Sequence, residues 1–198
     1  MELVLATRNK KKIEEITRIL KDLPVRLYTL DDFPGCPEVV EDADSFEGNA
    51  VKKAKAVSGY TQKPALSDDS GLEVYALKNA PGVLSARYAG ENADDQRNVD
   101  KLLSELSVAG DEKRGARFVC CIALSFPDGG VETFVGAVEG RIGEERRGSN
   151  GFGYDPVFYP EGHSTTFAEM SAGEKDSLSH RGRALESLRA YLRAALAD

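Results

Sequence analysis

Two adjacent aspartates stand between apolar residues in the segment "PALSDDSGLEV", which runs from Pro64 to Val74. Ala65-Leu66 precedes Asp68 and Asp69, and more apolar residues follow. Burying an unpaired ionised carboxylate in a dry site costs on the order of several kcal/mol. The fold must therefore bring positive charge to this point of the chain, either from basic side chains or from a bound cation.

Length, composition and charge restrict the function classes. The 198 residues suit one domain, or one domain with two lobes. Hydrophobic residues make up 41% and charged residues 30%, which is typical of a globular enzyme and excludes a disordered chain. A net charge of −7 argues against binding nucleic acid without regard to sequence, which needs a basic face, but it permits a small anionic ligand.

The apolar runs and the cysteines indicate the compartment of the protein. The start "MELVLATRNK" lacks the pattern of a secretory signal, and no run approaches the ~18 apolar residues of a membrane span. Cys36, Cys120 and Cys121 form no C-x-x-C pair. We therefore expect a reduced, cytoplasmic protein with no membrane association and no thiolate metal site.

Apolar periodicity predicts strands and helices mixed along the chain. Ser45 and Asp94 are expected N-caps, and the turn "PDGG" joins two long apolar runs as an antiparallel pair. We predict an α/β fold with a mixed sheet and flanking helices, in a single domain spanning 1–198. The expected strands cover 2–6, 25–30, a short segment from 65, 116–126, 131–142 and a short segment before 160; the expected helices cover about 10–22, 45–59, 94–106 and 171–198.

The segment "ATRNKKK" lies where a strand ends and a helix begins. Free N–H groups and the positive end of the helix dipole favour phosphate there. Lysines in the first turn oppose the dipole, and a bound polyanion would resolve that conflict. A solvated lysine patch is an equally good interpretation of this stretch by itself. The candidate residues are Thr7, Arg8, Asn9, Lys10, Lys11 and Lys12.

Asp68, Asp69 and Ser70 are predicted to lie at the carboxyl end of a short strand, where ligands bind in open α/β sheets. Carboxylates suit Mg²⁺, which takes one or two of them together with substrate phosphates. Glu41, in an acidic loop before the second helix, could reach the same cation. A plain turn at "DDSG" and a solvated acidic loop are the alternatives, and the sequence leaves open which aspartate would act as a base.

Two further segments could contact a nucleotide. In "GFGYDP" the glycines free the backbone, while Phe152 and Tyr154 offer faces for stacking on a purine; a tight turn with core aromatics is the alternative. In "EKDSLSHRG" the pairs Lys175/Ser179 and Ser177/Arg181 have i, i+4 spacing, which predicts two polar faces of one helix, with His180 beside them.

In this order, these segments resemble the inosine/xanthosine triphosphate pyrophosphatases over nearly the whole chain. The resemblance is carried by T-x-N-x-x-K at Thr7, Asn9 and Lys12, by "SFEGNAVKKA", "SDDSGLEV", "PGVLSARYAG" and "GFGYDPVF", and by "SHRG". The chain departs from the family pattern at Arg8, Gly48 and Asn150.

The resemblance implies an elongated mixed sheet, two lobes around a central nucleotide cleft, a homodimer, and Mg²⁺-dependent hydrolysis of ITP, dITP or XTP to the monophosphate and pyrophosphate. It implies that Asp69 is the catalytic carboxylate and a metal ligand, and that Glu41 is the second metal ligand. The implied substrate contacts are Thr7, Arg8, Asn9, Lys10, Lys11, Lys12, Ser70, Phe152, Gly153, Tyr154, Asp155, Lys175, His180 and Arg181.

On this basis we expect a magnesium triphosphate to be the counter-charge of both aspartates, with Asp69 orienting or deprotonating the attacking water. Two other functions remain as alternatives. One is a septum-formation-inhibitor-type nucleotide pyrophosphatase, against which "SHRG" and "GFGYDP" argue. The other is a non-catalytic nucleotide- or RNA-binding module, which would have no need of Asp69 and Glu41.

Overall fold

The computed structural model describes residues 1–109 and 113–197, so the last residue of the predicted C-terminal helix, Asp198, lies outside the described residues. The chain divides into two compact units. Unit 1 comprises Met1–Asp69, Cys120–Gly136 and Arg181–Asp198, and unit 2 comprises Ser70–Val119 and Ala137–His180.

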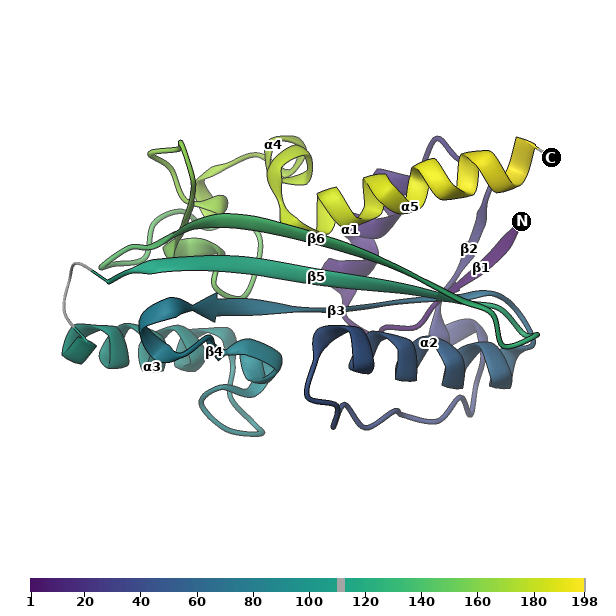
Figure 1. Cartoon of the computed structure of the whole chain (residues 1–198), viewed down its shortest axis with the longest axis horizontal. Coiled ribbons are helices and arrows are strands. Elements are labelled where there is room, and N and C mark those ends of the chain that lie inside the picture. Colours follow the sequence, from purple (N-terminus) through teal and green to yellow (C-terminus); the bar gives the residue numbers. More distant parts are fainter. Residues whose placement is uncertain (110–112, 198) are drawn as a thin grey trace. The chain divides into compact units, whose positions relative to one another are not determined.

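The described strands form one sheet in the order β2-β1-β3-β5-β6-β7, with β4 paired to β3 (Figure 1). The strands are β1 (Glu2–Leu5), β2 (Arg26–Tyr28), β3 (Ala65–Val74), β4 (Ala80–Pro81), β5 (Gly115–Ser125), β6 (Val131–Ile142) and β7 (Phe158–Pro160). The α-helices are α1 (Lys10–Leu20), α2 (Phe46–Thr61), α3 (Asp95–Ala109), α4 (Ala172–Leu178) and α5 (His180–Ala197). Short 3₁₀ helices cover Leu30–Asp32, Tyr75–Leu77, Gly82–Arg87, Asp155–Val157 and Phe167–Glu169.

Unit 1 is built from two parallel strand pairings, because β1 pairs with both β2 and β3. Side chains alternate across a strand. Leu3 and Leu5 therefore pack with apolar residues of α1 and α5, whereas Val4 and Ala6 pack on the other face with Val57 of α2. Figure 1 shows α2 and α5 on opposite sides of these strands.

The register of β1 against β3 explains where the aspartates lie. Leu5 pairs with Leu66, and the Ala6 N–H donates to the Leu66 carbonyl at 2.7 Å. Beyond this point β1 has ended and the chain turns into α1, while β3 continues through Asp68 and Asp69. The two aspartates thus lie within β3, just beyond the carboxyl end of β1 and of its parallel pairing with β3, at the edge where open α/β sheets bind ligands.

The prediction of a short strand from Ala65 with the aspartates at its end is wrong, because β3 continues to Val74. The alternative of a plain turn at "DDSG" is wrong for the same reason. The second half of β3 has its own partners in unit 2. Glu73 and Val74 pair antiparallel with β4, and Leu72 and Val74 enter a core with Phe118, Phe158 and α3. The predicted antiparallel component of the sheet is confirmed by this pairing and by that of β6 with β7.

The predicted single C-terminal helix is also wrong. Ser179 is extended (φ −71°, ψ 158°) and separates α4 from α5. Ser179 therefore lies outside both helices, so the pairs Lys175/Ser179 and Ser177/Arg181 do not lie on the faces of one continuous helix. In α5 the leucines at 185, 188 and 192 are fully buried, whereas Leu196 is 36% exposed.

Helix starts were predictable and one helix end was not. The Ser45 side chain caps α2 by accepting from the Gly48 N–H at 3.0 Å, and Asp94 accepts from the Arg97 N–H at 2.8 Å. Helix α2 passes Gly59 and ends at Thr61, with Gln62 in the left-handed region (φ 53°). Within residues 1–109 and 113–197, every helix is too short or too polar to cross a bilayer.

Candidate active site

Asp68 is held by protein cations. Its carboxylate is 1% exposed, and Oδ2 accepts from Arg181 Nε at 3.1 Å and Nη2 at 2.9 Å. Lys12 Nζ lies 3.1 Å from the same oxygen. Burial would raise the pKa of Asp68, but the charges of Lys12 and Arg181 hold it well below its usual range. The expectation that a magnesium triphosphate is its counter-charge is therefore wrong.

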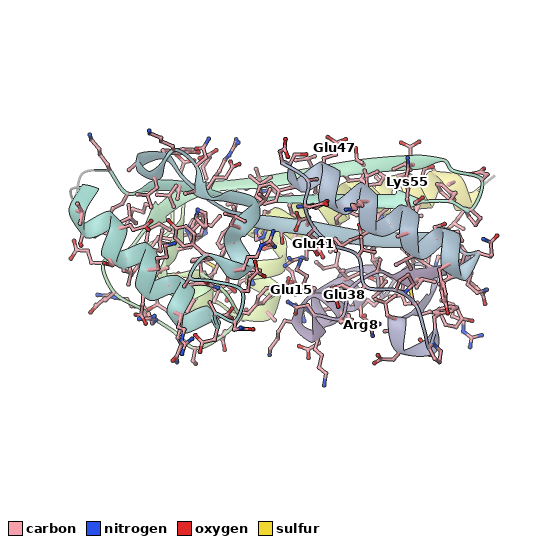
Figure 2. All side chains as sticks on the ribbon, turned by 90° about the horizontal axis from the view of Figure 1, so that it is seen from below. Arg8, Glu15, Glu38, Glu41, Glu47 and Lys55 are labelled. Atoms are coloured by element: carbon pink, nitrogen blue, oxygen red, sulfur yellow. The ribbon has the colours of Figure 1, made fainter. Side chains whose placement is uncertain are left out.

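Arg181 is engaged by two carboxylates. It is 1% exposed, and besides Asp68 it donates through Nη1 to Glu15 of α1, which Figure 2 labels. Burial would lower the pKa of the guanidinium, but Asp68 and Glu15 raise it overall. The implied contact of Arg181 with substrate stays a prediction.

Asp69 points to the other face of β3, as the pleat requires. Its Oδ2 accepts from Asn49 Nδ2 at 3.0 Å, and its Oδ1 lies 3.9 Å from Lys53 Nζ. Both partners belong to α2. The pKa of Asp69 is raised overall, mainly by burial and further by the negative charge of Glu41. The positive charges of Lys53 and Lys12 lower this pKa but do not outweigh burial. The two neighbouring aspartates therefore occupy different electrostatic environments.

Glu41 and Asp69 converge on one ammonium group. Lys53 Nζ donates to Glu41 Oε1 at 2.8 Å and to the Asp68 carbonyl at 2.8 Å. Glu41 lies on the irregular segment before α2 (Figure 2). Burial would lower the pKa of Lys53, but the negative charges of Asp68, Asp69 and Glu41 raise it overall. The predicted proximity of Glu41 and Asp69 to a shared cation position agrees with this geometry.

Within the part of the chain that the structure describes, no three His, Cys, Asp or Glu side chains cluster as a metal site. Mg²⁺ does not require such a cluster, since it commonly binds through one or two carboxylates, waters and substrate phosphates. The hard oxygen donors of Glu41 and Asp69, already gathered around one positive charge, fit that requirement.

The residues around the start of α1 differ in their contacts: one caps the helix, one pairs with Asp68 and others are exposed. Asn9 caps the helix, since its Oδ1 accepts from the backbone N–H groups of Lys11 and Lys12 at 3.0 and 3.3 Å, and Thr7 Oγ1 accepts from the Asn9 N–H at 3.2 Å. Lys12 turns inward to Asp68. Lys10 and Lys11 are exposed, as is Arg8, whose Nη1 lies 3.8 Å from Asp31.

In unit 2, Asp155 organises the glycine-rich loop. It is 2% exposed, and its Oδ2 accepts from the Phe152 N–H at 2.9 Å and from Lys175 Nζ at 2.6 Å. The same ammonium lies 4.9 Å from the centroid of the Phe152 ring. Gly153 N–H donates to Asp95 of α3 at 2.8 Å.

Two of the predicted aromatic and imidazole contacts are packed into unit 2. Tyr154 is 4% exposed and donates to the Ser85 carbonyl at 2.9 Å, which agrees with the alternative of a core aromatic; its contact with substrate stays a prediction. His180 is 4% exposed, and its ring stacks on Phe118 with centroids 4.6 Å apart and 10° between planes. Ser70 follows Asp69 in β3 and is partly buried.

Sequence reasoning missed the partners of the predicted residues. Asn49 and Lys53 carried a usable signal, because each lies three residues after a buried residue of α2, Phe46 and Ala50 respectively. Such positions lie on the buried face of the helix, where apolar residues are expected. Glu15 and Phe118 gave no such signal. Asn150, which departs from the family pattern, has a hydrogen-bond partner: its Nδ2 donates to the Met170 carbonyl at 2.9 Å.

A model of the Ham1 family matches residues 3–191. The chain belongs to the Ham1 family. This Ham1 chain is 52% identical over 190 residues to the dITP/XTP pyrophosphatase of Shouchella clausii, covering 95% of this chain and 94% of the relative. It is 52% identical over 190 residues to the protein of that name from Geobacter sulfurreducens, covering 96% of each chain. The resemblance carried by the sequence segments is thereby confirmed.

Solved structures agree with this assignment. A HAM1 protein from Coxiella burnetii has a TM-score of 0.91 and 43% identity, covering 98% of this chain and 99% of that one. The Staphylococcus aureus Ham1 protein has a TM-score of 0.88 and 39% identity, covering 98% of this chain and 100% of that one. The predicted α/β class with a mixed sheet flanked by helices is confirmed for this Ham1 chain.

We predict that Asp68→Asn destabilises the fold strongly. The change removes the carboxylate that two buried cations face, and breaking one side of a buried ion pair costs about 3–5 kcal/mol. Chemical denaturation measures the free energy of unfolding. Asp44→Asn, at an exposed position of the same unit, is the control. A loss for Asp68→Asn no larger than that of the control would contradict the assigned role.

We predict that Gly151→Ala is more destabilising than Gly153→Ala. Both glycines have positive φ, 73° and 61°, so both substitutions carry backbone strain of about 1–2 kcal/mol. A Cβ at Gly151 would in addition overlap the Asp155 carboxylate, whereas one at Gly153 meets no atom within 4 Å. Thermal unfolding of both variants gives the comparison, and equal losses would show that the Asp155 contact does not constrain this turn.

Proposed function

We propose that this protein hydrolyses non-standard purine nucleoside triphosphates, namely ITP, dITP and XTP, to the monophosphate and pyrophosphate, and so removes them from the nucleotide pool. The observation that supports this most is the different pairing of the two aspartates. Asp68 is neutralised by Arg181 and Lys12, while Asp69 and Glu41 gather around Lys53 of α2. The names of the relatives at 52% identity point to the same substrates.

Within this proposal, Glu41 and Asp69 would hold Mg²⁺ together with the substrate phosphates. When bound, such an ion neutralises phosphate charge and makes the phosphorus more susceptible to attack. Asp69 accepts a hydrogen bond from the attacking water and orients it toward the α-phosphorus. The new P–O bond forms as the bond from the α-phosphorus to the bridging oxygen breaks, pyrophosphate leaves, and Asp69 takes the water's proton and passes it to solvent. Orientation contributes more than basicity in this scheme, because phosphoryl transfer depends chiefly on positioning and charge stabilisation.

The other implied residues keep supporting roles in the proposal. The exposed Lys10 and Lys11, with Thr7, Arg8 and Asn9, bind phosphate oxygens at the start of α1. The resemblance assigns base and substrate recognition to the remaining residues, with Phe152 as the stacking face. They are Ser70, Phe152, Gly153, Tyr154, Asp155, Lys175, His180 and Arg181.

We further propose a homodimer of single-domain chains acting in the cytoplasm. The dimer, the single domain and the central nucleotide cleft rest on the family resemblance. The compartment rests on cysteine usage: Cys36, Cys120 and Cys121 are buried free thiols, which suits a reducing environment.

We predict that Asp69→Asn lowers pyrophosphate release from ITP by about 10²- to 10⁴-fold, the usual contribution of a positioned proton acceptor, while the protein stays folded. Asp44→Asn, exposed on the segment before α2, is expected to keep wild-type turnover. The assay is run with and without Mg²⁺. A nucleotide-binding module would release no pyrophosphate in either condition, and near-normal turnover of Asp69→Asn would refute the catalytic assignment.

We predict selection for the 6-oxo group of the base. A site that hydrogen-bonds one edge leaves buried partners unpaired when the wrong edge enters, which costs about 10³-fold or more in kcat/KM. ITP and XTP are therefore expected to exceed ATP by that margin. GTP shares the 6-oxo group and is expected to be slower than ITP because of its 2-amino group. A competition assay of the four nucleotides measures this, and comparable rates for ATP and ITP would rule out edge reading.

A further inference from the structure

The side chain of Asn49 lies between the acidic segment and the proposed catalytic carboxylate. Asn49 belongs to α2 and is fully buried, at 0% exposure. Its Oδ1 accepts from the Ala43 N–H at 2.9 Å, and its Nδ2 donates to Asp69 Oδ2 at 3.0 Å. A longer contact of 3.5 Å joins Nδ2 to the Ala43 carbonyl. One amide thus contacts two parts of the chain that carry the proposed metal ligands.

Chemistry fixes which way this amide points. The backbone N–H of Ala43 is a donor only, so the atom that faces it at 2.9 Å is the amide oxygen. The NH₂ group is then directed at Asp69. The Asp69 carboxylate in turn has one oxygen anchored by Asn49, while Oδ1 is the oxygen that lies 3.9 Å from Lys53 Nζ. The amide therefore sets the rotation of the carboxylate as well as its position.

The same amide sets the distance between the two carboxylates. Ala43 is two residues after Glu41, and its main chain is tied to Asn49 on α2. Lys53, one helical turn further along α2, binds Glu41 directly. Asn49 and Lys53 are thus two attachments of the acidic segment to the helix, and of the two only Asn49 makes a short hydrogen bond to Asp69.

Helix stability and packing alone would favour another residue at this position. Apart from Lys53, the buried face of α2 is filled by small or apolar residues such as Ala50, Ala54 and Val57, and asparagine is a poorer helix former than alanine. A buried amide also carries a desolvation cost unless its donors and acceptor are used. At Asn49 they are used on Ala43 and Asp69.

We propose that Asn49 is a positioning residue for the hydrolytic reaction: it orients the Asp69 carboxylate and holds the Glu41 segment at a fixed distance from it. This inference rests on the proposed function, in which Asp69 orients the attacking water. Its loss is expected to lower kcat, because the attacking water is misaligned, while KM changes little since the Asn49 side chain is fully buried and is not a proposed substrate contact.

Two substitutions separate the contacts of Asn49. Asn49→Ala removes both. Asn49→Asp is nearly isosteric and keeps an acceptor for the Ala43 N–H, but it replaces the donor that faces Asp69 with a second carboxylate oxygen. Both variants are expected to lower kcat for ITP by about 10- to 100-fold, the range for losing a hydrogen bond to a charged group, with KM within about threefold of wild type.

Asn98 provides a matched control in unit 2. It is 2% exposed on α3, its Oδ1 accepts from the Ala89 N–H at 2.8 Å, and its Nδ2 donates to the Ala86 carbonyl at 3.1 Å. It ties a loop to a helix as Asn49 does, but through main-chain groups alone. Asn98→Ala is expected to lower the unfolding midpoint as Asn49→Ala does, yet to keep kcat within about twofold of wild type.

The outcomes distinguish the two proposals. A low kcat for Asn49→Ala and Asn49→Asp with near-wild-type kcat for Asn98→Ala supports positioning. If Asp69→Asn is inactive while the Asn49 variants keep wild-type kcat, or if Asn98→Ala loses as much kcat as Asn49→Ala, the positioning role is overturned and the proposed function stands. If Asp69→Asn keeps wild-type turnover, the catalytic assignment of Asp69 fails, and the positioning role of Asn49 fails with it. If the wild-type protein releases no pyrophosphate from ITP, the proposed function itself fails. Should Asn49→Asp not fold, Asn49→Ala alone carries the comparison.

Discussion

The ion pair between Asp68 and Arg181 is the interaction on which unit 1 most depends. Both residues are 1% exposed, and Lys12 and Glu15 of α1 complete the network. Removing such charges from water is costly, and the cost is offset only when every member has a partner. The network therefore requires β3, the first turns of α1 and the start of α5 to meet at one place. That place is the carboxyl end of β1, where the crossover geometry leaves room for a ligand.

The pleat of β3 determines where Asp69 lies once Asp68 is fixed by its ion pairs. Because neighbouring residues of a strand face opposite sides, fixing Asp68 toward α1 and α5 directs Asp69 toward α2. There it meets Asn49 and Lys53 and shares the ammonium with Glu41. One aspartate is thus tied to fixed protein cations, and the next is held in a set of oxygen donors that suits a metal-bound phosphate. Strand geometry therefore supports the proposal that Asp69, rather than Asp68, acts on the attacking water.

The sequence predicted much of this arrangement and failed where partners are distant. The apolar strand 2–6, the Ser45 cap and the convergence of Glu41 with Asp69 followed from local pattern and resemblance. The partners of Asp68 did not, because Arg181 is 113 residues away and has no periodic signal linking it to β3. The length of β3 depended on pairing with β4. The break at Ser179 was hidden because both flanking segments favour helix, and their basic side chains go to Asp155 and Asp68.

The central claim is that Asp68 is structural and Asp69 faces the reacting phosphates. It is tested most directly by a crystal structure of the protein with Mg²⁺ and a non-hydrolysable ITP analogue. We expect the metal and phosphates on Asp69 and Glu41, with Arg181 still bound to Asp68. A metal bound to Asp68 with Arg181 displaced, or a nucleotide far from both aspartates, would contradict the account.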